Sequence, residues 1–437
     1  MQARWRREGP PPAAKKRLGV RNISLHRLLE TFTVDASSRL SAEAAGGAEM
    51  PFELTEERGT GRVPLYCYTP LTGEFIESRM GLLATLPSYA DAAHALAETA
   101  ALDVYLSEHG VKAPGDGRGR SRAALGVFLD CLFADRSGFG FEPAHFEAAY
   151  AELERALYEG HCTATVIAPL LGVALDAGTT EIRLDENLSL IRGDALPEAP
   201  ADAIWGDGEE PNVLALLVVD QERAQRPPVA IARARFRRIL SALRLFERGG
   251  YALGPVGWAR TEAGRWRSVS VGIGGRPRLL TLVPAAQEDE LRAFYRLVAR
   301  RAPSPELAWA LARFEMGCER LAPFEALTDY LLALRALLEP EGPPSGRLAQ
   351  RLAVICAPPE DRVALSERTA RAMALERAVM SGLAGAGDDA GRPDAVVDEL
   401  AEHLRAILRD ALCGHLDPDL CAVADELLAE SAAAPAA

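Results

Sequence analysis

The pattern of apolar and polar positions changes its period along the chain. Over residues 51–79 apolar and polar residues alternate around Gly-Thr-Gly and Pro-Leu-Thr-Gly, which is typical of short strands joined by turns. Helical periods follow at about residues 88–108, 122–133 and 143–158. Alternation and β-branched residues return over residues 162–192, and residues 213–219 form a continuous apolar run. The first part of the chain is therefore predicted to mix strands and helices.

From residue 288 onward the pattern is that of amphipathic helices separated by Pro and Gly signals. The predicted helices span residues 288–300, 305–320, 324–338, 345–356, 361–383, 395–413 and 418–430. In the third of them Leu327, Leu331, Leu334 and Leu338 recur at steps of four and three, which indicates a buried stripe. The predicted fold class is an α+β N-terminal half followed by an all-α C-terminal helical bundle.

These changes of pattern divide the chain into five segments. The predicted segments are a basic disordered arm (1–48), a small sheet with covering helices (49–160), an α+β region (161–287), a helical bundle (288–431) and a disordered tail (432–437). The first 21 residues carry a net charge of +6, which leaves −19 on the rest. The arm is therefore expected either to contact nucleic acid or to stay solvated against the acidic body.

Composition narrows the class of protein. The chain has 437 residues, of which 48% are hydrophobic and 25% charged, so it is neither wholly disordered nor collagen-like. Its net charge of −13 argues against bulk electrostatic attachment to nucleic acid or to an anionic membrane. No apolar run reaches the roughly 18 residues of a membrane span, and no signal-peptide core follows the basic start. A cytoplasmic protein is expected, with its seven scattered cysteines reduced.

The clearest basic feature lies on the helix predicted over residues 228–249. Arg233, Arg237, Arg244 and Arg248 fall within about 60° of one another around that helix, beside an apolar arc. Such a stripe is a candidate binding surface for the phosphates of a nucleic-acid backbone. The alternative is that the arginines form ion pairs with carboxylates of a neighbouring element. Trp258 and Trp266 follow among further arginines and are candidate stacking surfaces for bases, with core packing as the alternative.

No metal or cofactor site is predicted. His403, Cys413, His415 and Cys421 are zinc-type ligands in one stretch, but they lack the paired Cys-x-x-Cys spacing of zinc modules. The glycine-rich segments lack the residues of a P-loop or a dinucleotide-binding turn, and we find no recognisable hydrolase motif.

The helical domain resembles the HEPN superfamily, in particular its ApeA-like branch. The segments that carry the resemblance are, in order, WALARFEMGCERLAPFEALTDYLLALRALLEP, RLAQRLAVICA and ALERAVMSGL. The preceding segments EIRLDENLSLIRG and FRRILSALRLFERGGYALG are similar to the strand and helix that precede this domain in the branch. The resemblance spans about residues 162–430, and the first 160 residues match no family that we recognise.

The resemblance implies a dimer in which an Arg and a His near a helix end act on RNA. In that chemistry Arg stabilises phosphate charge, and His moves a proton near neutral pH. This chain departs from the pattern, because Glu376 stands where the Arg is expected and Ser381 where the His is expected, with Arg377 one place later. No histidine lies between His161 and His403. Arg409 and His415 form a displaced pair with a similar spacing, on the next predicted helix.

The sequence therefore predicts a non-catalytic binding or scaffold protein with a degenerate HEPN-like domain, in bacterial defence or RNA-linked regulation. We expect a homodimer through the helical domain and a partner that is an RNA or a protein, with no membrane. One alternative is a HEPN-type ribonuclease that uses Arg377 or the pair Arg409 and His415. The other is a purely structural homo-oligomer.

Overall fold

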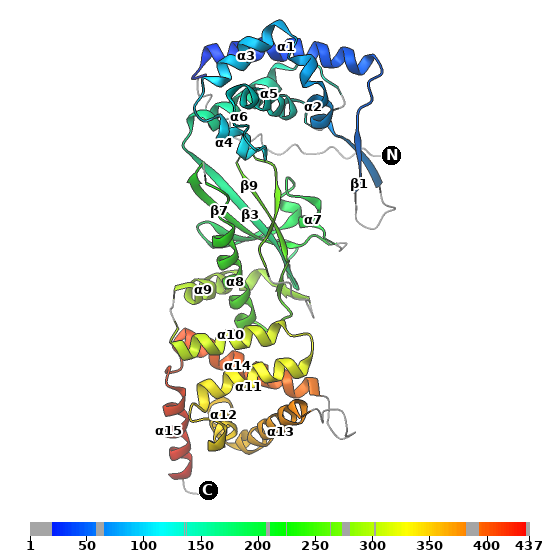
Figure 1. The fold of residues 1–437 in the computed structure, drawn as a ribbon. Helices are drawn as coiled ribbons and strands as arrows, with labels where there is room; N and C mark the ends of the chain where they lie inside the picture. Colours follow the sequence, from blue (N-terminus) through cyan, green and yellow to red (C-terminus); the bar gives the residue numbers. More distant parts are fainter. Residues whose placement is uncertain are drawn as a thin grey trace.

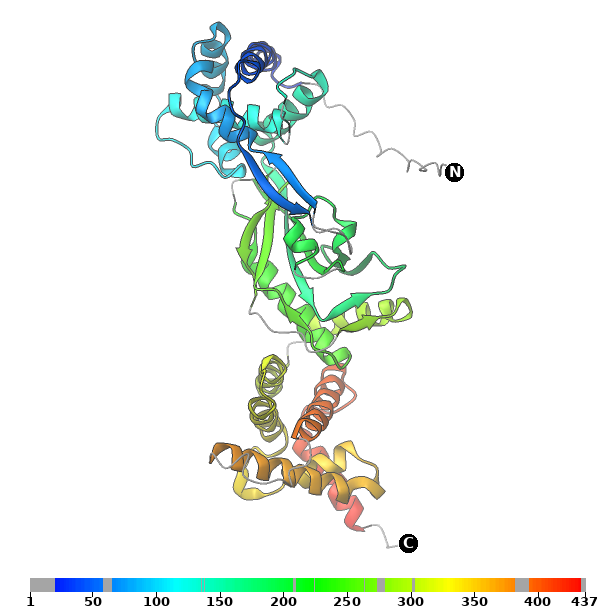
Figure 2. The same ribbon diagram turned by 90° about the vertical axis from the view of Figure 1, so that its right-hand side faces the viewer.

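The computed structural model describes residues 20–57, 65–134, 136, 138–206, 210–223, 225–262, 264–272, 280–300, 303–381 and 393–433. The described chain forms three units that follow one another along an elongated molecule (Figures 1 and 2). We call them the N-terminal unit (residues 20–158), the sheet unit (161–300) and the bundle (303–433). Residues 1–19 of the predicted arm and 434–437 of the predicted tail lie outside the described residues.

The N-terminal unit is a group of helices with one β-hairpin. Its elements are α1 (Ile23–Ala45), β1 (Phe52–Glu57), β2 (Leu65–Pro70), α2 (Thr72–Leu83), α3 (Pro87–Ala97), α4 (Leu102–Glu108), α5 (Gly117–Phe133) and α6 (Pro143–Tyr158). The prediction of a disordered arm up to residue 48 is wrong from Ile23 onward. The helix α1 buries four large apolar side chains among the other helices: Leu25, Leu29, Phe32 and Leu40. These residues recur at the spacing of one helix face, although the residues between them are polar or small.

The prediction of a small sheet with covering helices is also wrong in part. β1 and β2 do pair as an antiparallel hairpin, but residues 72–79, predicted to continue the strands, belong to α2. The helices pack against one another in a core rich in aromatic rings, among them Phe75, Phe128, Phe139 and Phe146. Helix–helix contact, rather than a sheet, therefore organises this unit.

The sheet unit is built on antiparallel strands. Its elements are β3 (His161–Leu171), β4 (Val173–Leu175), β5 (Glu181–Asp185), β6 (Leu188–Arg192), α7 (Ala201–Ile204), β7 (Val213–Glu222), α8 (Val229–Phe246), β8 (Ala252–Leu253), β9 (Val256–Thr261), β10 (Arg267–Ser270), β11 (Thr281–Val283) and α9 (Glu288–Arg300). The strand order is β10-β9-β3-β7-β6-β5, with β8 paired to the end of β3. β4 and β11 form a separate parallel pair. The predicted α+β character of this region is confirmed.

The two faces of this sheet carry different cores. Alternate residues of β3, such as Val166 and Ala168, face a large core that includes α8 and α9. Ile167 faces the other way, into a smaller core with Leu214 and α7. Leu291 and Tyr295 of α9 are buried in the larger core, so α9 belongs to the sheet unit. The predicted start of the helical bundle at residue 288 is therefore too early.

The bundle contains the remaining helices. They are α10 (Pro305–Glu319), α11 (Pro323–Leu338), α12 (Leu348–Cys356), α13 (Arg362–Met380), α14 (Pro393–Cys413) and α15 (Leu420–Ala433). The predicted Leu stripe of α11 is buried at the centre, where α11 packs against the five other helices. A helical C-terminal part is thus confirmed. Of the helices in the described residues, none combines the length and the apolar character that spanning a bilayer requires.

Two different junctions join the sheet unit to its neighbours. At the N-terminal unit, Arg223 follows β7 and forms a buried ion pair with Glu108 at the end of α4, 2.9 Å apart. At the bundle, α8 runs out of the sheet core, and its residue Leu245 is fully buried in the bundle core. On the bundle side, Arg405 of α14 donates from Nε to the Arg244 carbonyl at 2.8 Å.

Candidate functional site

The position matched to the HEPN arginine lies on the inner face of α13. Leu365, Thr369, Ala372 and Glu376 are buried at steps of four, three and four, so Glu376 belongs to the packed face. Its carboxylate accepts two hydrogen bonds from the Arg335 guanidinium of α11, at 3.1 and 2.5 Å. A paired, buried carboxylate of this kind fixes two helices together and offers no positive charge to a phosphate.

The neighbouring candidates point outward. Arg377 is exposed, one residue and about 100° around the helix from Glu376. Ser381 caps the C-terminal end of α13, and its hydroxyl donates to the carbonyls of Arg377 and Ala378 at 2.9 and 3.1 Å. The hydroxyl of Ser381 therefore supports the helix end, and the structure gives it no contact with a catalytic base in the described residues.

The displaced pair comes together around one carboxylate. Gly414 has a positive φ of 78° after α14, and this turn lets the His415 amide donate to the Asp410 carbonyl at 2.8 Å. The turn places His415 Nδ1 3.9 Å from Asp410 Oδ1, while Arg409 Nε lies 3.6 Å from the same oxygen. The His415 side chain is 74% exposed, so both groups are open to solvent.

The predicted basic stripe is not a free surface. Arg244 is buried between α8 and the bundle, where it forms an ion pair with Glu319 at 3.2 Å and donates to the Tyr251 carbonyl. Arg248 lies beyond the end of α8 and pairs with Asp398 at 2.6 Å and with Glu402. Arg233 and Arg237 remain exposed. The spacing of the arginines shows that they share one face of the helix, but it does not show what packs against that face. The sequence therefore could not reveal that the bundle covers Arg244 and Arg248.

The two tryptophans pack inside the sheet unit. Trp258 on β9 and Trp266 just before β10 lie against the smaller core, under α7. Trp266 Nε1 donates to the Glu198 carbonyl at 2.7 Å, and the Arg260 guanidinium covers its ring at 4.4 Å from the centroid. One face of the Trp266 ring is therefore occupied by Arg260.

The four zinc-type residues of the C-terminal stretch do not gather into a ligand cluster in the described chain. His403 lies near Glu399, and its pKa is lowered by burial. Cys421 contacts Arg351 at 3.7 Å. The described residues contain one group of three or more His, Cys, Asp or Glu side chains with ligand atoms within 4.8 Å of one another: His109, Cys131 and Glu152.

This cluster lies where three helices of the N-terminal unit meet. His109 caps the end of α4, Cys131 is on α5 and Glu152 is on α6. His109 Nδ1 lies 3.7 Å from Cys131 Sγ, and His109 Nε2 lies 3.0 Å from Glu152 Oε1. Burial, with the carboxylates of Glu152 and Asp130, raises the pKa of Cys131 to about 12. Reasoning from the sequence missed this site, because its three residues share no motif spacing.

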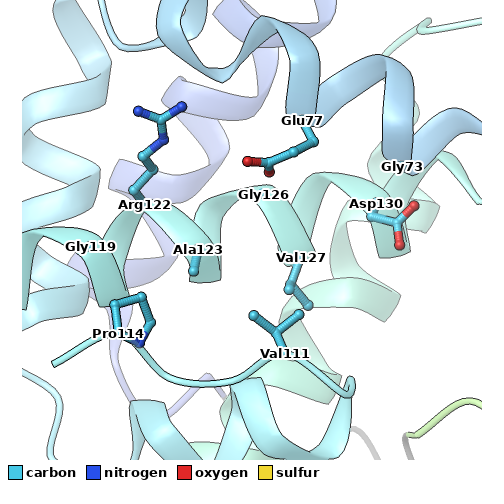
Figure 3. Close-up of a pocket in the computed structure, with 10 residues that line it drawn as sticks. All are labelled: Gly73, Glu77, Val111, Pro114, Gly119, Arg122, Ala123, Gly126, Val127 and Asp130. Carbon is cyan, nitrogen blue, oxygen red and sulfur yellow. The ribbon is translucent and has the colours of Figure 1, made fainter.

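An open groove of about 560 Å³ lies beside the cluster, between α2, α5 and the loop before α5. Figure 3 shows Glu77 and Arg122 reaching toward the same space, with Asp130 farther along α5. Asp130 is already paired with Arg265 of the sheet unit at 2.7 Å. The groove thus offers one arginine and one carboxylate to a ligand, on walls formed partly by Val111 and Pro114.

Similarity to known proteins does not add to this picture. Neither the protein-family models, nor the curated proteins, nor the solved structures to which the chain was compared gave a match.

Proposed function

We propose that this protein is a non-catalytic scaffold whose bundle is a degenerate HEPN-like domain. The observation that supports the proposal is the bidentate contact between Glu376 and Arg335. A ribonuclease of the HEPN type needs an unpaired Arg at this helix position, facing the scissile phosphate. Here the position holds a buried carboxylate whose role in packing is complete without any ligand.

The same proposal takes the partner to be a protein rather than a nucleic acid. The chain carries a net charge of −13, and three of the four arginines of the predicted stripe are engaged within the molecule: Arg244 and Arg248 pair with carboxylates, and Arg233 donates to the Ser270 carbonyl at 2.7 Å. Trp309 and Met316, seven residues apart on one face of α10, are 42% and 40% exposed. Exposed large apolar side chains at this spacing favour association through the bundle, and a homodimer is the simplest form of it. A cytoplasmic location and a role in bacterial defence belong to the same proposal.

The test is to incubate the purified protein with a pool of labelled single-stranded and structured RNA at two salt concentrations. We expect neither cleavage nor salt-sensitive retention, together with a mass by light scattering of twice the 46.9 kDa chain. Retention that is lost in the Arg233→Glu, Arg237→Glu double variant would replace the protein partner by RNA. Arg244 is unsuitable for this test, because its burial would confuse binding with unfolding.

A second candidate function is a ribonuclease that uses the displaced pair. The observation that favours it is the placement of Arg409 and His415 against one oxygen of Asp410, because a carboxylate can orient an imidazole for proton transfer. Cleavage that disappears in His415→Ala but persists in the surface control His94→Ala would establish it and overturn the scaffold proposal. His94 also pairs with a carboxylate and is 76% exposed, so it is a matched control.

A further inference from the structure

The cluster of His109, Cys131 and Glu152 has the composition of a transition-metal site. We propose that these three side chains bind one divalent ion of the zinc class at the meeting point of α4, α5 and α6. Thiolate, imidazole and carboxylate are the three ligand types that zinc accepts in proteins. The proposal is independent of the scaffold function, because it concerns a different unit of the molecule.

The distances between the ligand atoms support a shared ion. Zinc–ligand bonds of about 2.0–2.3 Å place the donors of a tetrahedral site roughly 3.3–3.8 Å apart. Sγ of Cys131 lies 3.7 Å from one ring nitrogen of His109, and one ligand atom from each of the three residues lies within 4.8 Å of the other two. His109 presents Nδ1 to Cys131 and Nε2 to Glu152, so a rotation of the side chains would bring one of these nitrogens, the sulfur and a carboxylate oxygen around one ion, and water would take the fourth position.

A second observation points to a missing ligand. The His109 side chain is 6% exposed, and its Nε2 lies 3.0 Å from Glu152 Oε1. The geometry nevertheless leaves both of these buried atoms without a hydrogen-bond partner among the described residues. Buried polar atoms are almost always satisfied, so two that lie this close without the alignment of a hydrogen bond mark a place for a cation.

A nucleophilic Cys–His–Glu arrangement is the competing interpretation of the same residues. The lining of the neighbouring groove includes Asp130 but none of the three cluster residues, so the thiol does not face the space that a substrate would enter. Glu152 keeps 22% of its side chain exposed, which gives an ion a route from solvent. The placement therefore favours a small ion over a reacting substrate, and the ion would tie three helices together.

The experiment uses the full-length untagged protein, stripped with a chelator and titrated with Co²⁺ as a spectroscopic probe. We expect one cobalt ion per chain with a thiolate-to-cobalt charge-transfer band, and displacement of the cobalt by Zn²⁺. Cys131→Ser should abolish the band, and Glu152→Gln should weaken cobalt binding at least about tenfold. Cys356→Ser is the matched control, because Cys356 is a partly buried free thiol in the bundle.

Circular dichroism of each variant without metal separates loss of the site from loss of the fold, and Glu152→Gln keeps the shape of the side chain if Cys131→Ser does not fold. The proposal is overturned if the wild-type protein binds no cobalt, or if Cys131→Ser and Cys356→Ser bind it equally. Rapid alkylation of Cys131 by iodoacetamide in a protein that takes up no metal would instead indicate the nucleophile.

Discussion

The two junctions of the sheet unit differ in what holds them. Toward the N-terminal unit the contacts are mainly charged: Arg223 pairs with Glu108, and Arg267 donates to the Glu108 carbonyl. Toward the bundle, one continuous helix enters the next core, and Leu245 is buried there with no exposed surface. One sheet is therefore attached at one end mainly by ion pairs and at the other by a shared apolar core, to which Arg244 and Arg248 add ion pairs. The two ends should respond differently to salt, to pH and to cavities.

The largest effect is expected at the charged junction. Glu108→Ala removes the nearer carboxylate of Arg223, whose side chain is only 3% exposed, and leaves a buried positive charge with only the more distant Glu159, 3.8 Å away. We expect a loss of about 4 kcal/mol in the free energy of unfolding. Calorimetry should also show the N-terminal unit unfolding in a separate, earlier transition.

Glu98→Ala is the control for this change, because Glu98 forms an exposed pair with His94 in the same unit. Adding Arg223→Met to Glu108→Ala should recover part of the stability, since it removes the unpaired charge. Equal losses for Glu98→Ala and Glu108→Ala would show that the buried ion pair does not hold this junction.

The apolar junction should show the next largest effect. Leu245→Ala creates a cavity where α8 meets the bundle, and we expect it to cost about 3 kcal/mol in chemical denaturation. Because no charge is involved, this loss should not change with salt concentration. Leu280→Ala, at a leucine that is 67% exposed, should cost less than about 0.5 kcal/mol. A salt-dependent loss at Leu245 would remove the distinction between the two junctions.

A carboxylate makes the bundle junction sensitive to pH. Glu315 of α10 hydrogen-bonds Ser241 of α8, and burial raises its pKa above the ordinary value, against the opposing effects of Ser241 and Arg244. The folded protein therefore holds this proton more tightly than the unfolded chain, so stability falls as pH rises from about 4.5 through the raised pKa. Glu315→Gln should remove that fall.

Thermal melting from pH 4 to pH 8 measures this effect, as the difference between the wild type and Glu315→Gln. The exposed Glu306 on the same helix supplies the control substitution, Glu306→Gln. If the two variants follow the same pH profile, Glu315 is not the group that titrates.

The smallest effect is expected at the exposed pair of the charged junction. Arg265 donates to Asp130 at 2.7 Å, but its side chain is 66% exposed. Arg265→Ala should cost less than about 1 kcal/mol at low salt and almost nothing at 1 M salt. Chemical denaturation at the two salt concentrations tests this prediction. A loss of stability as large as that of Glu108→Ala would mean that burial does not determine how much each ion pair contributes.

The sequence predicted elements better than it predicted partners. The apolar periods of α6 and α8 predicted their positions to within a few residues, because the apolar face of a helix depends only on the spacing of residues within that segment. The helix α1 was missed, since basic and small residues around it suggested disorder. The burial of Arg244 depends on a bundle that begins some sixty residues later, and the contact of Glu376 with Arg335 depends on how α11 crosses α13. Neither relation is encoded in local spacing.

The candidate metal cluster shows the same limit more strongly. His109, Cys131 and Glu152 come from three helices, and each residue by itself is ordinary in its helix. Only the packing of α4, α5 and α6 brings their ligand atoms together. By contrast, Glu376 could be singled out from the sequence, because the proposed resemblance to HEPN proteins specifies one residue type at one position.

The end-to-end order of the three units has a hydrodynamic consequence (Figures 1 and 2). A compact chain of 437 residues would have a radius of gyration of about 22 Å, and a rod of the same mass exceeds it. The frictional coefficient of the rod is also larger, so a single chain leaves a gel-filtration column at the volume of a heavier globular protein. An elongated monomer could therefore be mistaken for a dimer from its elution volume alone. Light scattering measures the mass of the particle independently of its shape.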